Sequence, residues 1–304
     1  MALNITTAFP LVNLTTKPPN LVPPPDNDQA SLVSACVFYT IVAFFSVFGN
    51  IMVIVAFFMN DKLRTVTNYF VVGLAAADIL VGAVSIPMWM YILVNTGSRA
   101  LLTVYNVFDI FAGISSILHL MAISVERYFC VGWAIKHRNT PKYVYYIGLL
   151  FVWSISALVA CIRPMAPNFR QMDLSLLIFV VFFTLPLVVI ILSYAAIWKI
   201  AVTRMSNNPT KRSLKREIRT AITIAFVIGF FFIAWSPFFV INLTYVFCPT
   251  CPYSMKLFMF FKFLHYSNSA VNPVVYGVRI PEFRKTFKFI FRQMCGRCIS
   301  FGRH

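Results

Sequence analysis

Long stretches without a charged side chain constrain this chain more than any other feature. No Lys, Arg, Asp or Glu occurs in 29–60, 65–77, 79–98, 110–125, 143–162, 174–198, 220–255 or 263–278. An apolar helix of about 20 residues spans the hydrocarbon core of a bilayer. Single acids, Asp78 and Asp109, interrupt two of the longer apolar segments, and joining the runs across them leaves seven spans. We expect these spans at 35–58, 68–93, 102–130, 143–163, 174–202, 218–246 and 256–278.

The composition agrees with a membrane environment. Hydrophobic residues make up 60% of the 304 residues and charged residues only 12%, whereas a soluble globular chain is about 25% charged. So few charges cannot cover a water-facing surface, and so much apolar surface cannot remain disordered in water. The sequence therefore predicts an all-α membrane protein, a seven-transmembrane helix bundle, and argues against a soluble enzyme.

The basic residues give the bundle an orientation. Of the 26 Lys and Arg residues, 20 lie at or beyond the same end of the predicted spans, and the other six, Lys262 among them, are assigned to the opposite side. Lys and Arg accumulate in cytoplasmic loops, so we expect an extracellular N-terminus, a cytoplasmic C-terminus and a multi-pass protein of the plasma membrane. The net charge of +17 then faces anionic lipid, and no nucleic-acid partner is expected.

The two ends of the chain differ from the bundle in composition. The first 34 residues hold six of the 17 prolines and the sequons that begin at Asn4 and Asn13. Such a segment is extended, and its sequons are glycosylation sites only outside the cell. We therefore divide the chain into an extracellular glycosylated tail at 1–34, the bundle at 35–278, and a cytoplasmic eighth helix and tail at 279–304.

A polar stripe runs along the third span. Ser116 and Arg127 follow Asp109 by seven and eighteen residues, and at 100° per residue these offsets place all three within about 20° on one helix face. Ionisable groups inside a membrane helix usually face the bundle interior and are candidate functional residues. An alternative interpretation makes Asp109 a structural acid with a local partner.

Other polar residues and prolines interrupt the second, sixth and seventh spans. Asp78 lies among small residues that allow close helix contact. Pro237 and Pro273 remove backbone donors, so these helices are candidate hinges, although many such kinks are static.

These residues and a few more, one set per span and in chain order, resemble the helix signatures of the rhodopsin-like (class A) G-protein-coupled receptors. The resemblance covers about 35–293 and rests on Gly49-Asn50, Leu74-Ala-Ala-Ala-Asp78, Glu126-Arg127-Tyr128, Trp153, Pro186 with Tyr194, Trp235-Ser-Pro237 and Asn272-Pro273-Val-Val-Tyr276. It implies a receptor that binds an extracellular ligand and activates a heterotrimeric G protein.

The resemblance also implies an activation switch and an ion site. The switch consists of Glu126, Arg127, Tyr128, Glu217, Tyr194, Pro237, Asn272, Pro273 and Tyr276, with Arg127 pairing to Glu217 in the inactive state. The family's sodium pocket corresponds to Asp78, Ser116, Asn268, Ser269 and Asn272. Buried oxygen ligands suit Na⁺, and a water-filled polar network is the alternative; no other cofactor is expected.

For the ligand, Asp109 stands where aminergic receptors carry the carboxylate that pairs with a protonated amine. Trp235, Phe238 and Phe239 match the aromatic floor of that site, and Tyr266 matches the tyrosine that hydrogen-bonds the carboxylate. A carboxylate beside aromatic rings binds a cation by a charge-assisted hydrogen bond and by cation–π contacts. This part of the resemblance predicts a protonated biogenic amine as the extracellular small-molecule ligand.

Departures from the family pattern keep other ligands open. Leu102 stands where most members have a cysteine bonded to the second extracellular loop, and this loss resembles the melanocortin and adenosine receptors. Ile178, Phe179 and Phe182 replace the serines of catecholamine receptors, which disfavours a catechol. A peptide, lipid or nucleoside ligand is therefore the alternative, and a membrane transporter is a more distant one.

The cysteines suggest two further features. Cys248 and Cys251 lie outside, where an oxidising compartment favours a disulfide. Cys295 and Cys298 follow an amphipathic basic stretch at 283–291 that resembles the family's eighth helix, which makes them candidates for palmitoylation. The four histidines show no metal-ligand spacing and no catalytic constellation is evident, so we predict that the protein is not an enzyme.

Overall fold

The computed structural model describes residues 29–95, 99–166, 171–207, 212–248, 250–251 and 254–301. Within these ranges the side chains are described except at Arg99, Arg163, Gln171 and Arg279 and over 204–228 and 294–301. The described residues form helices, short turns and no strand.

Seven membrane-length segments follow one another in the chain, and each predicted span falls inside one of them. They are α1 (Gln29–Met59), α2–η3–α3 (Val66–Leu80, Val81–Ser85, Ile86–Val94), α4 (Arg99–Gly132), α6 (Lys142–Met165), α7–η4–α8 (Gln171–Leu177, Ile178–Thr184, Leu185–Asn207), α9 (Arg212–Phe247) and α10 (Met255–Arg279). Short helices η2 (Asp61–Leu63) and α5 (Ala134–Asn139) join them, and α11 (Pro281–Phe301) follows. The predicted all-α, seven-helix bundle is confirmed. The eighth helix is longer than predicted, and α1 begins six residues before the predicted start.

Two of the segments contain a π-helical turn just before a proline. η3 precedes Pro87 and η4 precedes Pro186. Proline lacks a backbone N–H and its ring clashes with the carbonyl four residues earlier, so a locally widened turn accommodates it. In η4 the Thr184 hydroxyl donates to the carbonyl of Phe179 at 2.9 Å, a side-chain bond within the widened turn.

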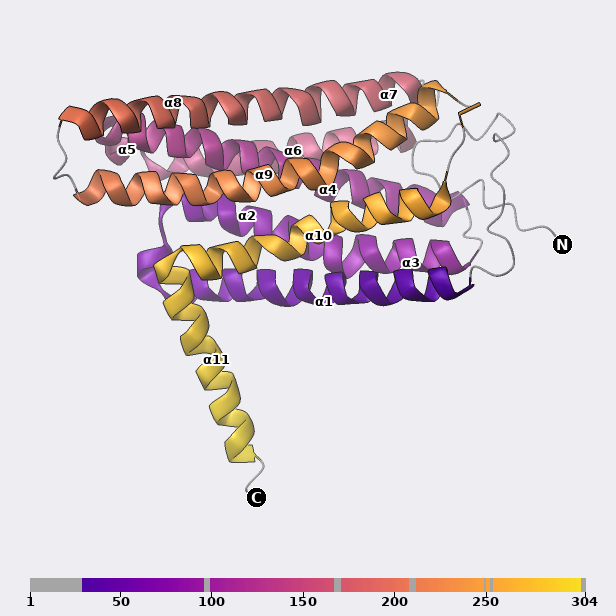
Figure 1. The fold of residues 1–304 in the computed structure, drawn as a ribbon, viewed down its shortest axis with the longest axis horizontal. Coiled ribbons are helices and arrows are strands. Elements are labelled where there is room, and N and C mark those ends of the chain that lie inside the picture. The colour runs from indigo at the N-terminus through magenta and orange to yellow at the C-terminus, as the bar shows by residue number, and fades with distance from the viewer. Residues whose placement is uncertain are drawn as a thin grey trace.

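The helices lie side by side along one axis, and α4 runs through the middle of the bundle (Figure 1). α4 packs on α2, α6, α8 and α9, while α10 packs on α1 and α9 and closes the ring. At the end of the bundle opposite the N-terminus, α11 leaves at a steep angle to the other helices (Figure 1). Because α4 contacts most of the other segments, its polar stripe lies where several helices meet.

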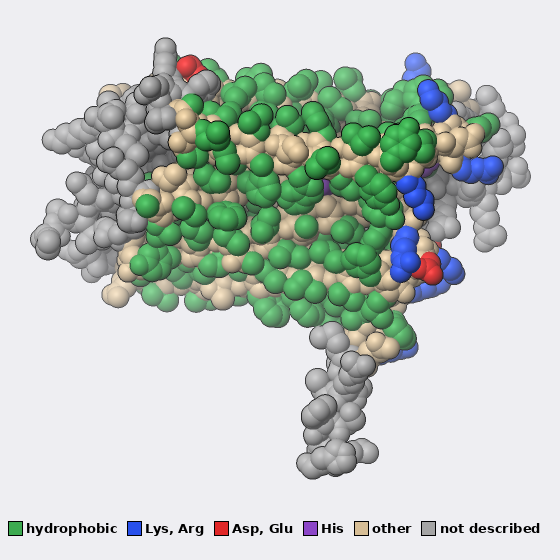
Figure 2. Space-filling view, turned by 180° about the vertical axis from the view of Figure 1, so that it is seen from behind, with side chains coloured by type: hydrophobic (Ala, Val, Ile, Leu, Met, Phe, Trp, Pro, Cys, Tyr) green, Lys and Arg blue, Asp and Glu red, His purple; other side chains and the backbone are tan. Residues whose placement is uncertain are grey.

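The exterior has the charge distribution of a membrane protein. Figure 2 shows hydrophobic side chains along the length of the bundle and Lys and Arg side chains gathered at the end from which α11 leaves. Six of the described helical segments are apolar enough to cross a bilayer by composition alone, and α10 is not among them. α10 is less apolar because it carries Lys262, His265, Asn268 and Asn272, all of which are buried inside the bundle.

One basic residue that the charge count assigned to the extracellular side is buried inside the bundle. The side chain of Lys262, which lies near the start of the seventh predicted span, is 0% exposed. Lys262 has a buried counter-ion, and paired charges are tolerated within a bundle.

Candidate functional site

The carboxylate of Asp109 on α4 is bonded by two residues of α10. The Lys262 ammonium lies 2.6 Å from Asp109 Oδ2, and the Tyr266 hydroxyl donates to Asp109 Oδ1 at 2.9 Å. Because the Tyr266 proton points toward Asp109, the Tyr105 hydroxyl at 2.9 Å acts as donor to Tyr266. The acid predicted to bind a ligand cation therefore has an internal cation as its partner.

Aromatic rings surround the Lys262 ammonium. Its Nζ lies 4.5 Å from the ring centre of Phe238 and 4.7 Å from that of Tyr266, with Tyr105 and Trp89 at 5.6 and 5.9 Å. These distances are within the range of cation–π attraction. The cage of rings and the carboxylate that would bind an amine ligand are, in this structure, arranged around a lysine of the same chain.

Helical periodicity places these residues on two helix faces, one on α4 and one on α10. Lys262 and Tyr266 are four residues apart on α10, and Tyr105 and Asp109 are four apart on α4, so each pair shares one helix face. The sequence interpretation found Asp109, Phe238 and Tyr266 but missed Lys262 and Tyr105. The spacing of Lys262, Tyr266 and Ser269, which places all three on one face of α10, is the signal that could have revealed the lysine.

The predicted aromatic floor is present beneath the ion pair. Trp235 and Phe238 are buried, and Phe239 packs between Trp235 and Phe183, 5.8 and 4.4 Å away between ring centres. His265, which the sequence interpretation did not single out, stacks on Phe238 at 4.6 Å and meets the edge of Trp235 at 4.0 Å. His265 is one turn from Lys262 on α10, so the ion pair and Trp235 are connected through adjoining side chains.

Deeper in the bundle, the predicted sodium-pocket residues surround Asp78. Its Oδ1 accepts from Ser269 at 2.8 Å and Ser116 at 3.3 Å, and its Oδ2 accepts from Asn272 Nδ2 at 2.7 Å. The fifth residue, Asn268, is buried, and its Oδ1 and that of Asn272 have no hydrogen-bond partner. A buried carboxylate with hydroxyl and unpartnered amide oxygens nearby is a donor set that suits a hard monovalent cation.

Toward the other end of α4 from Asp109, Glu126 connects three structural elements. It accepts from Arg127 Nε at 2.8 Å, from Thr67 of α2 at 2.5 Å, and lies 2.8 Å from His137 Nε2 of α5. The sequence interpretation assigned Glu126 and Arg127 to the switch and named neither Thr67 nor His137. Glu217, the predicted partner of Arg127, has a side chain outside the described part of the chain. Tyr128 packs edge-on against Trp133, with ring centres 5.2 Å apart.

A cavity of about 340 Å³ adjoins this network. Glu126, Arg127, His137 and Tyr276 are among its lining residues. Tyr276 stacks on Phe283 of α11 at 5.8 Å, while the hydroxyl of Tyr194 on α8 is buried without a hydrogen-bond partner. Of these two predicted switch tyrosines, Tyr276 lines the cavity.

The prolines of the predicted switch lie inside their helices. Pro237 falls within α9 two residues after Trp235, and Pro273 lies within α10 directly after Asn272. The Pro273 ring packs against α1 at Gly49, where an added Cβ would come within 2.9 Å of it.

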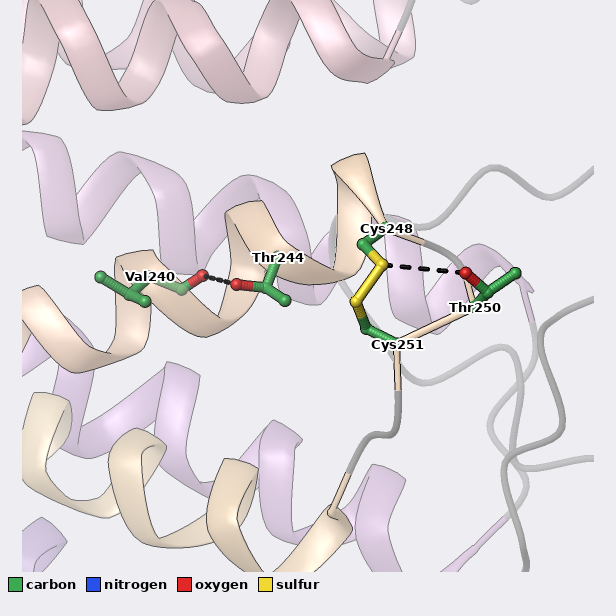
Figure 3. Close-up of a disulfide and its surroundings, with 5 residues drawn as sticks. All are labelled: Val240, Thr244, Cys248, Thr250 and Cys251. Carbon is green, nitrogen blue, oxygen red and sulfur yellow. Dashed lines mark hydrogen bonds between the residues drawn. A yellow bond between two sulfur atoms is a disulfide. The ribbon is translucent and has the colours of Figure 1, made fainter.

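Figure 3 shows the disulfide between Cys248 and Cys251, which closes the turn after α9 where the sequence predicted it. Thr250 lies within this turn, its hydroxyl 3.8 Å from the Cys248 sulfur. The predicted glycosylation sites, Asn4 and Asn13, lie outside the described residues. The predicted palmitoylation sites, Cys295 and Cys298, lie in α11 at positions whose side chains are not described.

Comparison with known proteins matches this chain to a family of membrane receptors. The family model described as "7 transmembrane receptor (rhodopsin family)" matches residues 49–173 and 163–276. These ranges include the Asp109, Asp78 and Glu126 sites.

Similar individual proteins come from two ligand groups. The adenosine receptor A2a of Canis lupus familiaris is 29% identical over 83% of this chain and 70% of its own length. The octopamine receptor beta-2R of Chilo suppressalis is 28% identical over 83% and 78%, and the dopamine receptor 1 of Drosophila melanogaster is 27% identical over 86% and 62%. The relatives thus divide between nucleoside and amine receptors.

Proposed function

Because the chain belongs to the rhodopsin family of seven-transmembrane receptors, we propose that it converts the binding of a small extracellular ligand beside Asp109 into activation of a heterotrimeric G protein at the plasma membrane. Family membership makes it a signalling receptor rather than an enzyme.

One observation carries this proposal. A single helix, α4, holds Asp109 at one end and the Glu126–Arg127 pair at the other, and it contacts α2, α6, α8 and α9 between them. Eighteen residues of helix separate the two sites by about 27 Å. A change in packing at the ligand end therefore has a continuous packed path to the cytoplasmic end.

The mechanism is a shift between two packings of the bundle. An agonist activates only if it binds the active arrangement more tightly than the inactive one. Ligand contact at Asp109 would move Trp235 through His265, and the helix interrupted by Pro237 would turn its cytoplasmic end outward. The cavity beside Arg127 would then widen to admit the G protein.

An amine ligand is the first candidate for this site. It is favoured by the carboxylate and its aromatic surroundings and by the octopamine and dopamine receptors among the relatives. An amine must, however, either displace the Lys262 ammonium from Asp109 or share Asp109 with it.

An uncharged ligand, such as a nucleoside, is the second candidate, and the Lys262 contact is the observation that favours it. With Asp109 already neutralised, the site can offer hydrogen bonds without receiving a charge. The similarity to the adenosine receptor A2a points the same way.

A G-protein activation assay tests the proposal. Cells expressing the wild type or Asp109→Asn are exposed to a panel of protonated amines and a panel of nucleosides, with surface expression measured for both proteins. We expect a ligand that activates the wild type and loses potency on the variant. A receptor that reaches the surface and activates no G protein with any compound of either panel, or with a zwitterionic amino acid, would contradict the proposed function.

A further inference from the structure

The Asp109–Lys262 pair sets a charge requirement for the ligand. The two side chains carry opposite charges, lie 2.6 Å apart, and are 10% and 0% exposed. A ligand cation at Asp109 would leave one positive charge uncompensated in a buried site. A ligand anion at Lys262 would leave one negative charge uncompensated there. Breaking a buried pair in this way is strongly unfavourable.

The Lys262 ammonium retains donors that no described acceptor uses. An ammonium has three N–H donors, and among the described residues Asp109 is the one hydrogen-bond acceptor that Lys262 contacts. Its remaining donors face aromatic rings, of which Phe238 and Tyr266 are the nearest. One turn along α10, His265 Nδ1 is also buried and has no hydrogen-bond partner. The lysine side of the pair can therefore accept a ligand group that carries hydrogen-bond acceptors.

A cluster of aromatic rings adjoins the pair through Phe238, which contacts both the Lys262 ammonium and Phe239. Phe179 and Phe183 stack at 5.8 Å, and both pack against Phe239, which in turn contacts Trp235. Such a cluster favours a flat, apolar ligand body, because ring pairs gain from offset and edge contacts.

We propose that the ligand is a zwitterion with an aromatic side chain, of the aromatic α-amino-acid type, whose ammonium binds Asp109 and whose carboxylate binds Lys262. This inference rests on the proposed function, since it assumes that the ligand binds beside Asp109. A zwitterion replaces one internal ion pair by two pairs with the ligand and leaves the buried site without net charge. A simple amine cannot do this.

Matched compounds isolate the charge requirement. Each of three rings (indole, phenyl and 4-hydroxyphenyl) is tested as the amino acid, the amine that lacks the carboxylate, and the propionate that lacks the ammonium. L-Tryptophan, tryptamine and indole-3-propionate form one such set. The full-length receptor is assayed in cells kept in amino-acid-free buffer, with G-protein activation as one readout. The shift in melting temperature of the solubilised receptor reports binding independently.

Two single variants should shift the charge preference of the receptor in opposite directions, and the double variant should abolish it. On the wild type, at least one amino acid should be more potent than its amine and its propionate by about tenfold or more. Lys262→Met removes the cation, so the preference should move to the amine by a similar factor. Asp109→Asn should move it to the propionate. The double variant, which has no charge to compensate, should show no charge preference.

The surface level of each variant distinguishes misfolding from a loss of ligand binding. Lys262→Met leaves a buried carboxylate without its cation, so its surface level should rise when cells are grown with the matched amine. The double variant should need no such rescue.

The inference is overturned if an amine is more potent than its amino acid on the wild type, or if Lys262→Met leaves the preference unchanged. Absence of binding by all nine compounds overturns it as well. If amino acids bind with the expected charge dependence and activate no G protein, the proposed function fails while the ligand class stands. If only amines or nucleosides activate, the receptor function stands and the zwitterion does not.

Discussion

At the scale of single residues, Gly73 on α2 allows an unusually close contact with His119 on α4. A Cβ at position 73 would lie 2.2 Å from His119 Nε2 and 2.6 Å from its Cδ2. The histidine is fully buried, its Nδ1 is held by the carbonyl of Ser115 at 2.7 Å, and Trp153 covers its ring at 5.3 Å. The imidazole therefore has little freedom to move aside.

We expect Gly73→Ala to destabilise the receptor by about 1–3 kcal/mol, because overpacking a filled core forces side chains and backbone to shift. The melting temperature of the purified protein measures the effect. Gly229→Ala is the matched control, since nothing lies within 4 Å of a Cβ there. Adding His119→Ala to Gly73→Ala should recover part of the loss. Equal melting temperatures for the two glycine variants would show that α2 and α4 are not in this contact.

The Asp78 cluster supports a second prediction at this scale, because we propose that it binds Na⁺. The carboxylate is fully buried, with Ser116, Ser269 and Asn272 as its hydrogen-bond partners and Asn268 Oδ1 unpartnered. Replacing KCl by NaCl should raise the melting temperature of the wild type and leave Asp78→Asn unaffected. Identical salt responses in the two proteins would instead indicate a polar network that holds only water.

At the scale of elements, α5 is held against the bundle by one polar contact and two ring contacts. His137 Nε2 lies 2.8 Å from Glu126 Oε1, and the imidazole packs edge-on against Phe129 and Tyr145, with centres 5.6 and 6.2 Å apart. Glu126 also accepts from Thr67 of α2. One carboxylate thereby links α2, α4 and α5 beside the cavity that Glu126, Arg127 and Tyr276 line.

His137→Phe should raise the basal G-protein activity of the receptor. The substitution keeps a ring against Phe129 and Tyr145 but removes a hydrogen bond to a charged group, worth about 1 kcal/mol at this partly exposed position. That corresponds to about a fivefold change in the ratio of active to inactive receptor. His137→Gln, which retains a donor, is the control and should stay close to the wild type. Basal activity that is the same for both variants would mean that the contact is equally present in both states.

At the scale of the whole molecule, the distribution of side chains defines a membrane orientation. Hydrophobic side chains extend along the bundle, while Lys and Arg gather at the end bearing α11 (Figure 2). Two buried acids are paired with a cation inside the bundle, Asp109 with Lys262 and Glu126 with Arg127. The third, Asp78, accepts hydrogen bonds from neutral side chains. The bundle therefore presents an apolar belt to lipid and a basic end to one leaflet.

We expect the N-terminus outside the cell and the C-terminus in the cytoplasm, since basic ends remain on the cytoplasmic side. An N-terminal tag should bind antibody on intact cells and a C-terminal tag only after permeabilisation. Asn4→Gln with Asn13→Gln should abolish the mobility shift produced by enzymatic deglycosylation. Staining of the C-terminal tag on intact cells would reverse the proposed orientation.

The sequence by itself determined the elements of this protein. Span positions follow from hydropathy, and the shared face of Asp109, Ser116 and Arg127 follows from helical periodicity; both are local properties of the chain. The residues of the Asp78 cluster could also be predicted from the sequence, because the resemblance to the receptor family assigned each of them on its own helix. The short α5 was not, since its six residues have no apolar period.

Only the tertiary structure decided which side chains meet. Lys262 and Asp109 are 153 residues apart, and their pairing depends on how α10 is rotated and shifted against α4. The same holds for Gly73 with His119 and for His137 with Glu126. Helix rotation is set by packing against all neighbours at once, so a pattern within one helix shows which face is polar but not which residue lies opposite.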